Sequence, residues 1–233
     1  MEIVEIKRQT LVKEVSNQLA KAIRNGFTGP DGLLPSERRL AAQFGVSRPV
    51  VREATKMLEF QGLVEIHQGL GIRVVDRLYA PLSAAAKLLL PDDMERLRQS
   101  LDVRMVLEPE IAKRAAERAT EQGIAKLHEI QRLLEAASSL EEAMEADIAF
   151  HSHLAEISGN NLFGIMLDSI ADLGRESRRA TMSEVGFERA FRQHAVLLSA
   201  IEKGDVSAAE QAMRDHICAA VHDLIAHLEM GDN

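Results

Sequence analysis

Three histidines and one aspartate lie among apolar residues at helical spacing, where they could bind a metal ion. Asp147 and His151 are four residues apart, so both project from the same side of a helix, one turn from each other. His194 and His216 each lie within the apolar stripe of a separate helical segment. Neutral imidazoles with one carboxylate suit a divalent transition metal and leave coordination positions open for oxygen ligands. The sequence therefore predicts a metal site at these four residues.

A single inward-facing histidine is more often a hydrogen-bonded residue of the core than a metal ligand. Four inward polar groups on three helices favour the metal site over that alternative. We expect one divalent transition metal per subunit, namely zinc, with nickel or manganese as alternatives. The helical angles exclude His153 and His222 from this cluster, because each points well away from the ligand on its own helix.

A second inward charge, Arg104, shares an apolar stripe with Leu97, Leu101, Glu108 and Ile111. Two interpretations stand side by side. Arg104 could form an ion pair with Glu108, four residues further along the same helix. It could instead bind a carboxylate ligand, because a guanidinium group matches a carboxylate with two parallel hydrogen bonds.

Two arginines near the N-terminus of the chain are arranged for contact with DNA. Arg48 and Arg52 project together from the start of a helix that Ser47 can cap and in which Pro49 is tolerated. A shorter helix precedes it, and Gly45 provides the left-handed turn between the two. This is the pattern of a helix-turn-helix, whose second helix enters the major groove, where arginine can bind guanine or phosphate.

Two short strands, at 63–67 and 72–75, are predicted directly after these helices, with a glycine-containing turn at 68–71 between them. Such a hairpin is the wing of a winged helix-turn-helix. A small packing unit with surface arginines is the alternative interpretation. The glycine turn, the paired arginines and the hairpin follow one another in the right order, which favours DNA binding.

The charge of the chain is divided unevenly. The 233 residues carry a net charge of −8, but residues 1–77 have 12 Lys and Arg against 9 Asp and Glu, a net of +3. Residues 78–233 have 16 against 27, a net of −11. The first part can therefore bind DNA while the second stays away from it.

The composition also limits the class of protein. Cys218 is the only cysteine, which excludes a disulfide framework, and no run of eighteen apolar residues could span a membrane. We therefore expect a cytoplasmic protein without a membrane partner. From about residue 93 onwards the pattern is helical throughout, with six long segments and a short one at 84–90.

The run LPSERRLAAQFGVSRPVVREA at 34–54, followed by GLVE at 62–65 and the two glycines of the turn, strongly resembles the DNA-binding domain of the GntR family of bacterial transcription regulators. The resemblance implies which residues contact DNA: Arg38, Ser47, Arg48, Arg52 and Gly69. Some members of this family have a histidine just before the glycine at the tip of the wing, where this chain has Gln68.

A second resemblance covers most of residues 93–220. The runs RMVLEPEIAKRAA, DIAFHSHLAEISGN, HAVLLSAIEKGD and AMRDH are similar to the FCD effector domain of the FadR-like subfamily. The resemblance implies an all-α bundle in which Asp147, His151, His194 and His216 bind the metal and Arg104 helps to bind a small organic acid. Members that bind acyl-CoA lack this metal set.

These observations predict a mainly α protein with an N-terminal winged helix-turn-helix and an all-α bundle of about seven helices. The expected domains are a DNA-binding domain at 1–77, a linker and short helix at 78–92, and an effector-binding, metal-binding and dimerisation domain at 93–233.

We expect a homodimeric transcription regulator, acting as a repressor, that binds double-stranded palindromic operator DNA under the control of a small carboxylate or sugar-acid effector. No catalytic residue is assigned, and we do not expect an enzyme. Two alternatives stay open: a metal-dependent hydrolase fused to a DNA-binding module, and an acyl-CoA-responsive regulator without a metal.

Overall fold

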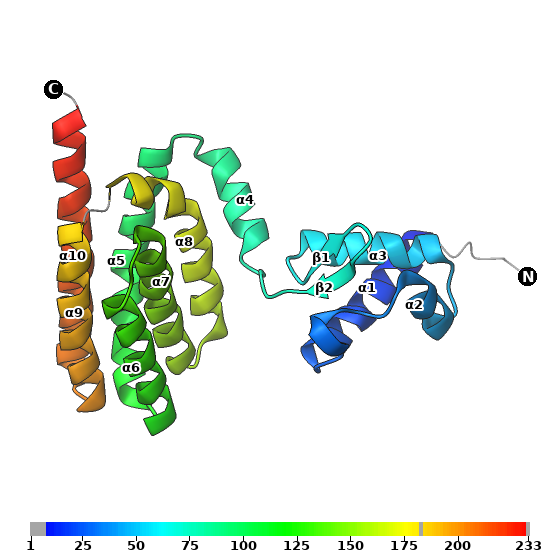
Figure 1. Cartoon of the computed structure of the whole chain (residues 1–233), viewed down its shortest axis with the longest axis horizontal. Helices are drawn as coiled ribbons and strands as arrows, with labels where there is room; N and C mark the ends of the chain where they lie inside the picture. Colours follow the sequence, from blue (N-terminus) through cyan, green and yellow to red (C-terminus); the bar gives the residue numbers. More distant parts are fainter. Residues whose placement is uncertain (1–7, 182–183, 232–233) are drawn as a thin grey trace, which may run out of the picture. The chain divides into compact units, whose positions relative to one another are not determined.

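The chain is described as a computed structural model that covers residues 8–181 and 184–231. It divides into two compact units, residues 1–81 and residues 82–233, and each is described by itself. The whole is mainly helical, as the sequence predicts (Figure 1). Within the described residues, no helix is both long enough and apolar enough to cross a membrane.

The first unit is a winged helix-turn-helix. Its elements are α1 (Arg8–Arg24), a 3-10 turn (Pro30–Gly32), α2 (Glu37–Phe44), α3 (Arg48–Phe60), β1 (Val64–His67) and β2 (Gly71–Val74). The two strands are antiparallel, with Val64 opposite Val74. One side of each helix and of the hairpin buries apolar side chains in a shared core that includes Leu19, Leu40, Val51, Leu58 and Ile72. This core fixes α2, α3 and the hairpin relative to one another.

The turn between α2 and α3 follows the predicted chemistry with one exception. Ser36 caps α2 by accepting a hydrogen bond from the backbone N–H of Arg39, at 3.4 Å. Gly45 ends α2 at φ 65°, a left-handed conformation that favours a residue without Cβ. Ser47 occupies the position before α3 in an extended conformation, but its side chain makes no capping hydrogen bond. The prediction that its hydroxyl caps α3 is therefore wrong.

The second unit is an all-α bundle. Its helices are α4 (Ala80–Leu89, which begins at the end of the first unit), α5 (Asp93–Arg118), α6 (Glu121–Glu135), α7 (Leu140–Ile157), α8 (Asn161–Thr181), α9 (Glu184–Glu202) and α10 (Val206–Gly231). This agrees with the prediction of about seven helices. Turns at Gly159 and Gly204, both at positive φ, separate α7 from α8 and α9 from α10. Gly123 lies inside the first turn of α6, and its N–H donates to the side chain of the capping residue Thr120.

The helices of the bundle are ordered around α5. This helix packs along α10 and also against α7, α8 and α9, while α6 packs against α7 and α9. The core contains Ile111 of α5, Leu127 of α6, Phe150 of α7, Leu197 of α9 and Met213 of α10, each at most 1% exposed. Side chains on the inner faces of α5, α7, α9 and α10 therefore meet in one shared core.

Helix α4 is attached to α8 by polar contacts. Ser83 Oγ donates to Asp172 Oδ2 at 2.6 Å, and Lys87 Nζ lies 2.8 Å from the same oxygen. Partial burial raises the pKa of the Asp172 carboxyl, but the hydrogen bonds from Lys87 and Ser83 outweigh that effect and hold the pKa below its usual value.

Candidate metal and effector site and candidate DNA-binding face

The four residues proposed as metal ligands come together in the core of the bundle. Helix α7 carries Asp147 and His151, α9 carries His194 and α10 carries His216. One potential ligand atom of each residue lies within 4.8 Å of those of the other three. All four side chains are buried, with exposures between 0% and 6%. Three separate helices therefore direct these groups to one point, as the stripes in the sequence predict.

Neighbouring side chains orient the imidazole rings of two of these histidines. His151 Nδ1 lies 2.5 Å from Glu108 Oε2, and His216 Nδ1 lies 3.2 Å from Gln193 Oε1. Each ring thus directs Nδ1 to a partner and leaves Nε2 for the centre of the cluster, which is how metal-binding histidines are commonly held. Consistent with this, the Nε2 atom of His151 lies 3.8 Å from Asp147 Oδ1.

His194 is the most deeply enclosed of the four. Its ring stacks on Phe150, with centroids 4.1 Å apart and planes 6° from parallel, and its Nε2 lies 3.5 Å from Asp147 Oδ1. Neither ring nitrogen has a hydrogen-bond partner, although the side chain is fully buried. Buried polar atoms of a protein nearly always have a partner. The two unpartnered ring nitrogens of His194 therefore point to a ligand that accepts a nitrogen lone pair.

Burial favours the neutral form of His194 and His216. It lowers the pKa of His194 to about 3, with only partial opposition from the charge of Asp147. Burial and the neighbouring histidines also bring the pKa of His216 well below its usual value. Neutral imidazole is the form that binds a metal ion. Three imidazoles and one carboxylate, with both ring nitrogens of the buried His194 unpartnered, fit a divalent transition metal.

Arg104 and Glu108 form a buried ion pair beside this cluster. The Arg104 Nε atom donates to Glu108, and the side chains are 7% and 1% exposed. Burial raises the pKa of the Glu108 carboxyl, but the charges of Arg104 and His151 outweigh this and hold the pKa well below its usual range. Arg104 also extends Nη2 to within 3.4 Å of His151 Nε2. The ion pair expected from the sequence is therefore present, and Arg104 still reaches the predicted metal cluster.

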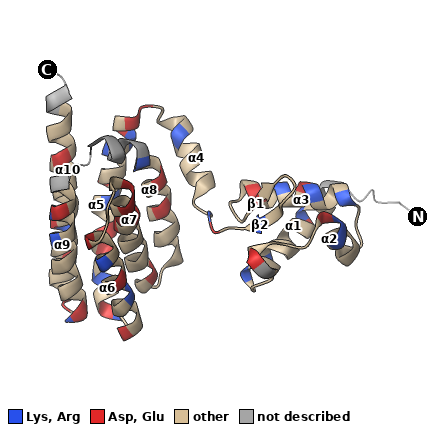
Figure 2. Cartoon of the chain, viewed as in Figure 1, with Lys and Arg blue, Asp and Glu red and all other residues tan. Residues whose placement is uncertain are grey.

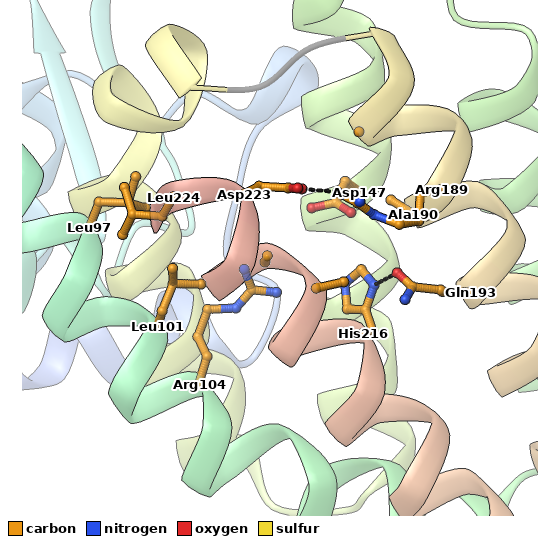
Figure 3. Close-up of a pocket in the computed structure, with 13 residues that line it drawn as sticks. Leu97, Leu101, Arg104, Asp147, Arg189, Ala190, Gln193, His216, Asp223 and Leu224 are labelled. Atoms are coloured by element: carbon orange, nitrogen blue, oxygen red, sulfur yellow. Dashed lines mark hydrogen bonds and ion pairs between the residues drawn. The ribbon is translucent and has the colours of Figure 1, made fainter. Parts of the chain in front are cut away.

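A pocket of about 60 Å³ opens next to Arg104 (Figure 3). Its buried end is formed by Arg104, Asp147 and His216, and three leucines of α5 and α10 form an apolar wall. Arg189 of α9 and Asp223 of α10 also line it and form an ion pair with each other. The guanidinium group of Arg104 and two of the four candidate metal ligands, Asp147 and His216, thus line the same pocket.

Other histidines lie outside this cluster. His153, two residues after His151, has its Nδ1 2.7 Å from Glu156 and its Nε2 3.2 Å from the carbonyl oxygen of Gly123. His128 forms an ion pair with Glu202 on the surface. The position of His153 agrees with the helical angle that excluded it from the cluster.

In the first unit, the arginines of α3 are exposed and lie close to Glu37. Arg52 binds Glu37 with two hydrogen bonds, of 3.2 Å from Nε and 3.1 Å from Nη2. Arg48 Nη2 lies 3.9 Å from the same carboxylate. Because Glu37 is the first residue of α2, it joins the two helices and holds both guanidinium groups on one face.

The other residues expected to contact DNA are also accessible. Arg38 and Ser47 are exposed, and the Ser47 hydroxyl is not used as a cap. Gly69 lies in the turn of the hairpin at φ 80°, with nothing within 4 Å of where a Cβ would be, so conformation and not crowding requires glycine there. Figure 2 shows Lys and Arg on the helices and hairpin of this unit, and many Asp and Glu along the helices of the bundle.

Several partners of these residues were not predicted from the sequence. Glu37 was not linked to Arg52, nor Gln193 to His216, and the Arg189–Asp223 pair was not identified at all. Glu108 was recognised as a partner of Arg104 but not of His151. Gln193 directly precedes a predicted ligand, which is the one signal in the sequence that could have drawn attention to it.

Comparison with known proteins gives matches along most of the chain. Residues 99–219 match the FCD domain, and residues 11–74 match the family described as bacterial regulatory proteins, gntR family. The first match covers all four candidate metal ligands and the Arg104–Glu108 pair. The second covers α2, α3 and the whole hairpin, with Arg48, Arg52 and Glu37.

Among curated proteins, the chain is 35% identical over 209 residues to the HTH-type transcriptional regulator LutR of Bacillus subtilis, an alignment covering 84% of this chain and 92% of that protein. It is 32% identical over 222 residues to the HTH-type transcriptional repressor NanR of Klebsiella aerogenes, covering 91% and 84%. Among solved structures, Streptococcus agalactiae GntR has the same fold, with a TM-score of 0.71 at 24% identity over 91% of this chain and 99% of that one.

Proposed function

Because this chain belongs to the gntR family of bacterial regulatory proteins and carries an FCD domain, it is a transcription regulator, and we propose that a small carboxylate effector bound at a metal site in the FCD domain controls its affinity for operator DNA. We further propose that it acts as a repressor, as the name of its relative NanR states for that protein. The observation that carries the proposal is the buried cluster of Asp147 and three histidines beside Arg104.

The metal would be held by Asp147, His151, His194 and His216. A divalent transition metal bound there supplies open coordination positions for carboxylate and hydroxyl oxygens of a ligand. Arg104 lines the same pocket and offers a guanidinium group to a second oxygen pair. The cavity of about 60 Å³ suits a small acid better than an acyl-CoA, and its histidines are the groups that a metal-free acyl-CoA site would not need.

The DNA-binding residues would be Arg38, Ser47, Arg48, Arg52 and Gly69. Arg48 and Arg52 would read base edges or phosphates in the major groove, because they project together from the first turns of α3. The unused hydroxyl of Ser47 would bind a phosphate, and Gly69 would let the hairpin backbone approach the sugar-phosphate chain. A homodimer would place two such faces on the half-sites of a palindromic operator.

The effector changes DNA affinity only if it binds one arrangement of the protein better than another. The pocket is formed by α5, α9 and α10 together with Asp147 of α7, so a bound acid contacts four helices at once. A ligand there would favour one packing of these helices. We propose that this packing determines the spacing of the two DNA-binding units of the dimer.

The test uses the full chain loaded with zinc and an operator selected from random duplexes. Fluorescence anisotropy measures the DNA affinity as hydroxy acids, sugar acids and dicarboxylates are added at fixed salt. We expect at least one small carboxylic acid to change the affinity of the parent protein. Loss of the response is expected in Arg104→Lys, which keeps the charge beside Glu108 but cannot bind a carboxylate through a planar fork.

The matched control is Arg98→Lys, an exposed arginine of the same helix that pairs with Glu95 and Asp102. It should respond to the acid like the parent. A full response in Arg104→Lys would remove Arg104 from the effector site and leave it as the partner of Glu108. Turnover of the same acids by the zinc-loaded protein would favour the hydrolase alternative instead.

A further inference from the structure

The pocket beside the metal cluster has a buried end and a solvent-facing end. Arg104, Asp147 and His216 are each at most 6% exposed, whereas the side chains of Arg189 and Asp223 are 37% and 43% exposed. Arg189 belongs to α9 and Asp223 to α10, the same helices that carry His194 and His216. Figure 3 shows the Arg189–Asp223 ion pair together with Arg104 and His216 around one pocket.

The charges of the described residues at the buried end leave room for one negative charge. Glu108 offsets the charge of Arg104. A histidine binds a metal ion in its neutral form, so a divalent metal bound by the three histidines and by Asp147 would retain a single positive charge. One carboxylate of a ligand balances that charge, and a second one there would be buried without a counter-charge.

Among the described residues that line it, the solvent-facing end has no net charge, because Arg189 and Asp223 offset each other. A carboxylate that reaches this end meets the negative charge of Asp223 and has to displace it from Arg189. A hydroxyl group meets no such repulsion, since it can donate to the Asp223 carboxylate and accept from the Arg189 guanidinium. The rest of the lining, which includes Leu97, Leu101 and Leu224, contributes no charge.

We infer that the Arg189–Asp223 pair makes the pocket selective for monocarboxylic acids with a hydroxylated chain, and that Asp223 is the residue that rejects the corresponding dicarboxylic acids. This inference rests on the proposed function, in which a carboxylate occupies the buried end. Rejection by a misplaced like charge is a common source of binding specificity.

Variants of this pair can be tested without loss of the fold. A partly exposed ion pair contributes little to stability, unlike the buried Arg104–Glu108 pair. Asp223→Asn keeps the size of the side chain and leaves the Arg189 charge available to a second carboxylate. Arg189→Gln does the opposite, because it leaves Asp223 without its counter-charge.

The probes are pairs of acids that differ only in the group at the far end of the chain: glycerate and tartronate, threonate and tartrate, gluconate and glucarate. Isothermal titration calorimetry on the full-length, zinc-loaded protein gives the affinity for each acid. The comparison uses the pair with the longest carbon chain that still binds. For that pair we expect the affinity of the parent for the monoacid to exceed its affinity for the diacid about tenfold or more. Asp223→Asn is expected to shift this ratio about tenfold towards the diacid, and Arg189→Gln is expected to shift it further towards the monoacid.

The matched control is Glu210→Gln, which removes another ion pair of α10, between Glu210 and Arg214, with side chains 42% and 44% exposed. Its monoacid-to-diacid ratio should equal that of the parent. If acids bind but Asp223→Asn leaves the ratio unchanged, or if the parent prefers the diacid, the selectivity assigned to this pair is wrong while the proposed function stands. If no acid binds to protein that holds its metal, the proposed function fails and the inference fails with it.

Discussion

Replacing Glu108 by glutamine is expected to destabilise the metal-free protein and also to weaken metal binding, although Glu108 is not one of the four candidate ligands. The carboxylate is 1% exposed, accepts from Arg104 and lies 2.5 Å from His151 Nδ1. Glutamine has nearly the same shape but no charge. The substitution therefore leaves the buried charge of Arg104 uncompensated and removes the group that orients the His151 ring.

The two effects have different magnitudes. Removing one partner of a buried ion pair costs about 3–5 kcal/mol, because the other charge stays buried. In a domain of this size about 1 kcal/mol lowers the melting temperature by about 2–4 °C, so we expect a decrease of about 6–20 °C. Loss of the group that orients a metal-binding histidine lowers metal affinity by about 10–100-fold.

Two measurements separate these effects. Thermal unfolding followed by circular dichroism in the presence of a chelator gives the stability of the metal-free protein. Competition with a zinc-binding dye gives the metal affinity. The control is Glu110→Gln, the same substitution two residues further along α5, where the side chain is 40% exposed and pairs with Lys113 and Arg114. Such a surface pair is worth about 0–1 kcal/mol, so little change is expected.

The reasoning would be refuted if the free energy of unfolding of metal-free Glu108→Gln lay within about 1 kcal/mol of that of the metal-free parent. The buried charge of Arg104 would then have another source of compensation. Unchanged zinc affinity would show that His151 is held in place without Glu108. A loss of stability no greater than that of Glu110→Gln would also show that the charge of Arg104 is compensated without Glu108.

Three further predictions concern other parts of the chain. Arg52→Ala should weaken operator binding by about 1–3 kcal/mol per half-site in a gel-shift titration at fixed salt, whereas Arg24→Ala, at the end of α1, should bind like the parent; equal affinities would remove Arg52 from the DNA-binding face. His194→Ala should lower both zinc content by elemental analysis and the melting temperature of zinc-loaded protein, with His153→Ala as the control; full zinc occupancy would contradict the four-ligand site. The pKa of Asp172 is below its usual value, so its ionised form stabilises the fold above an ordinary aspartate pKa of about 3.9, and this contribution is lost as the pH falls through the lower folded-state value. Urea unfolding should therefore show Asp172→Asn to be less stable than the parent at pH 7 and closer to it at pH 3, and a constant difference would argue against the ionised carboxylate as the cause.

Much of the DNA-binding unit could be predicted from the sequence because its determinants are local. A glycine with a left-handed conformation, a serine cap and two arginines four residues apart specify the turn and the exposed face of α3 within about twenty residues. The exception is Ser47, whose position was predicted correctly and whose hydrogen bond was not. The contact between Glu37 and Arg52, fifteen residues apart, depends on how α2 and α3 pack.

For the bundle, helical periodicity determined which side of each helix faces inward, and so identified all four candidate ligands. Asp147 and His151 are related by the helix itself, and the apolar stripes that contain His194 and His216 could be found one helix at a time. Periodicity did not show that those three helices meet at one point. The family resemblance implied it, and the structure then showed it. The order of the helices around α5 cannot be obtained from periodicity, because an apolar stripe states that a face is buried but not against which neighbour.

The orientation of each side chain was decided by tertiary structure alone. Whether Arg104 pairs with Glu108 or faces the pocket was open from the sequence, and in the fold one guanidinium group does both, since its Nε and Nη2 atoms point to different partners. The same holds for Arg189 and Asp223, which are 34 residues apart and meet only because α9 and α10 pack side by side. Local spacing fixes the face from which a side chain projects, whereas its partner depends on the packing of helices that are distant in the chain.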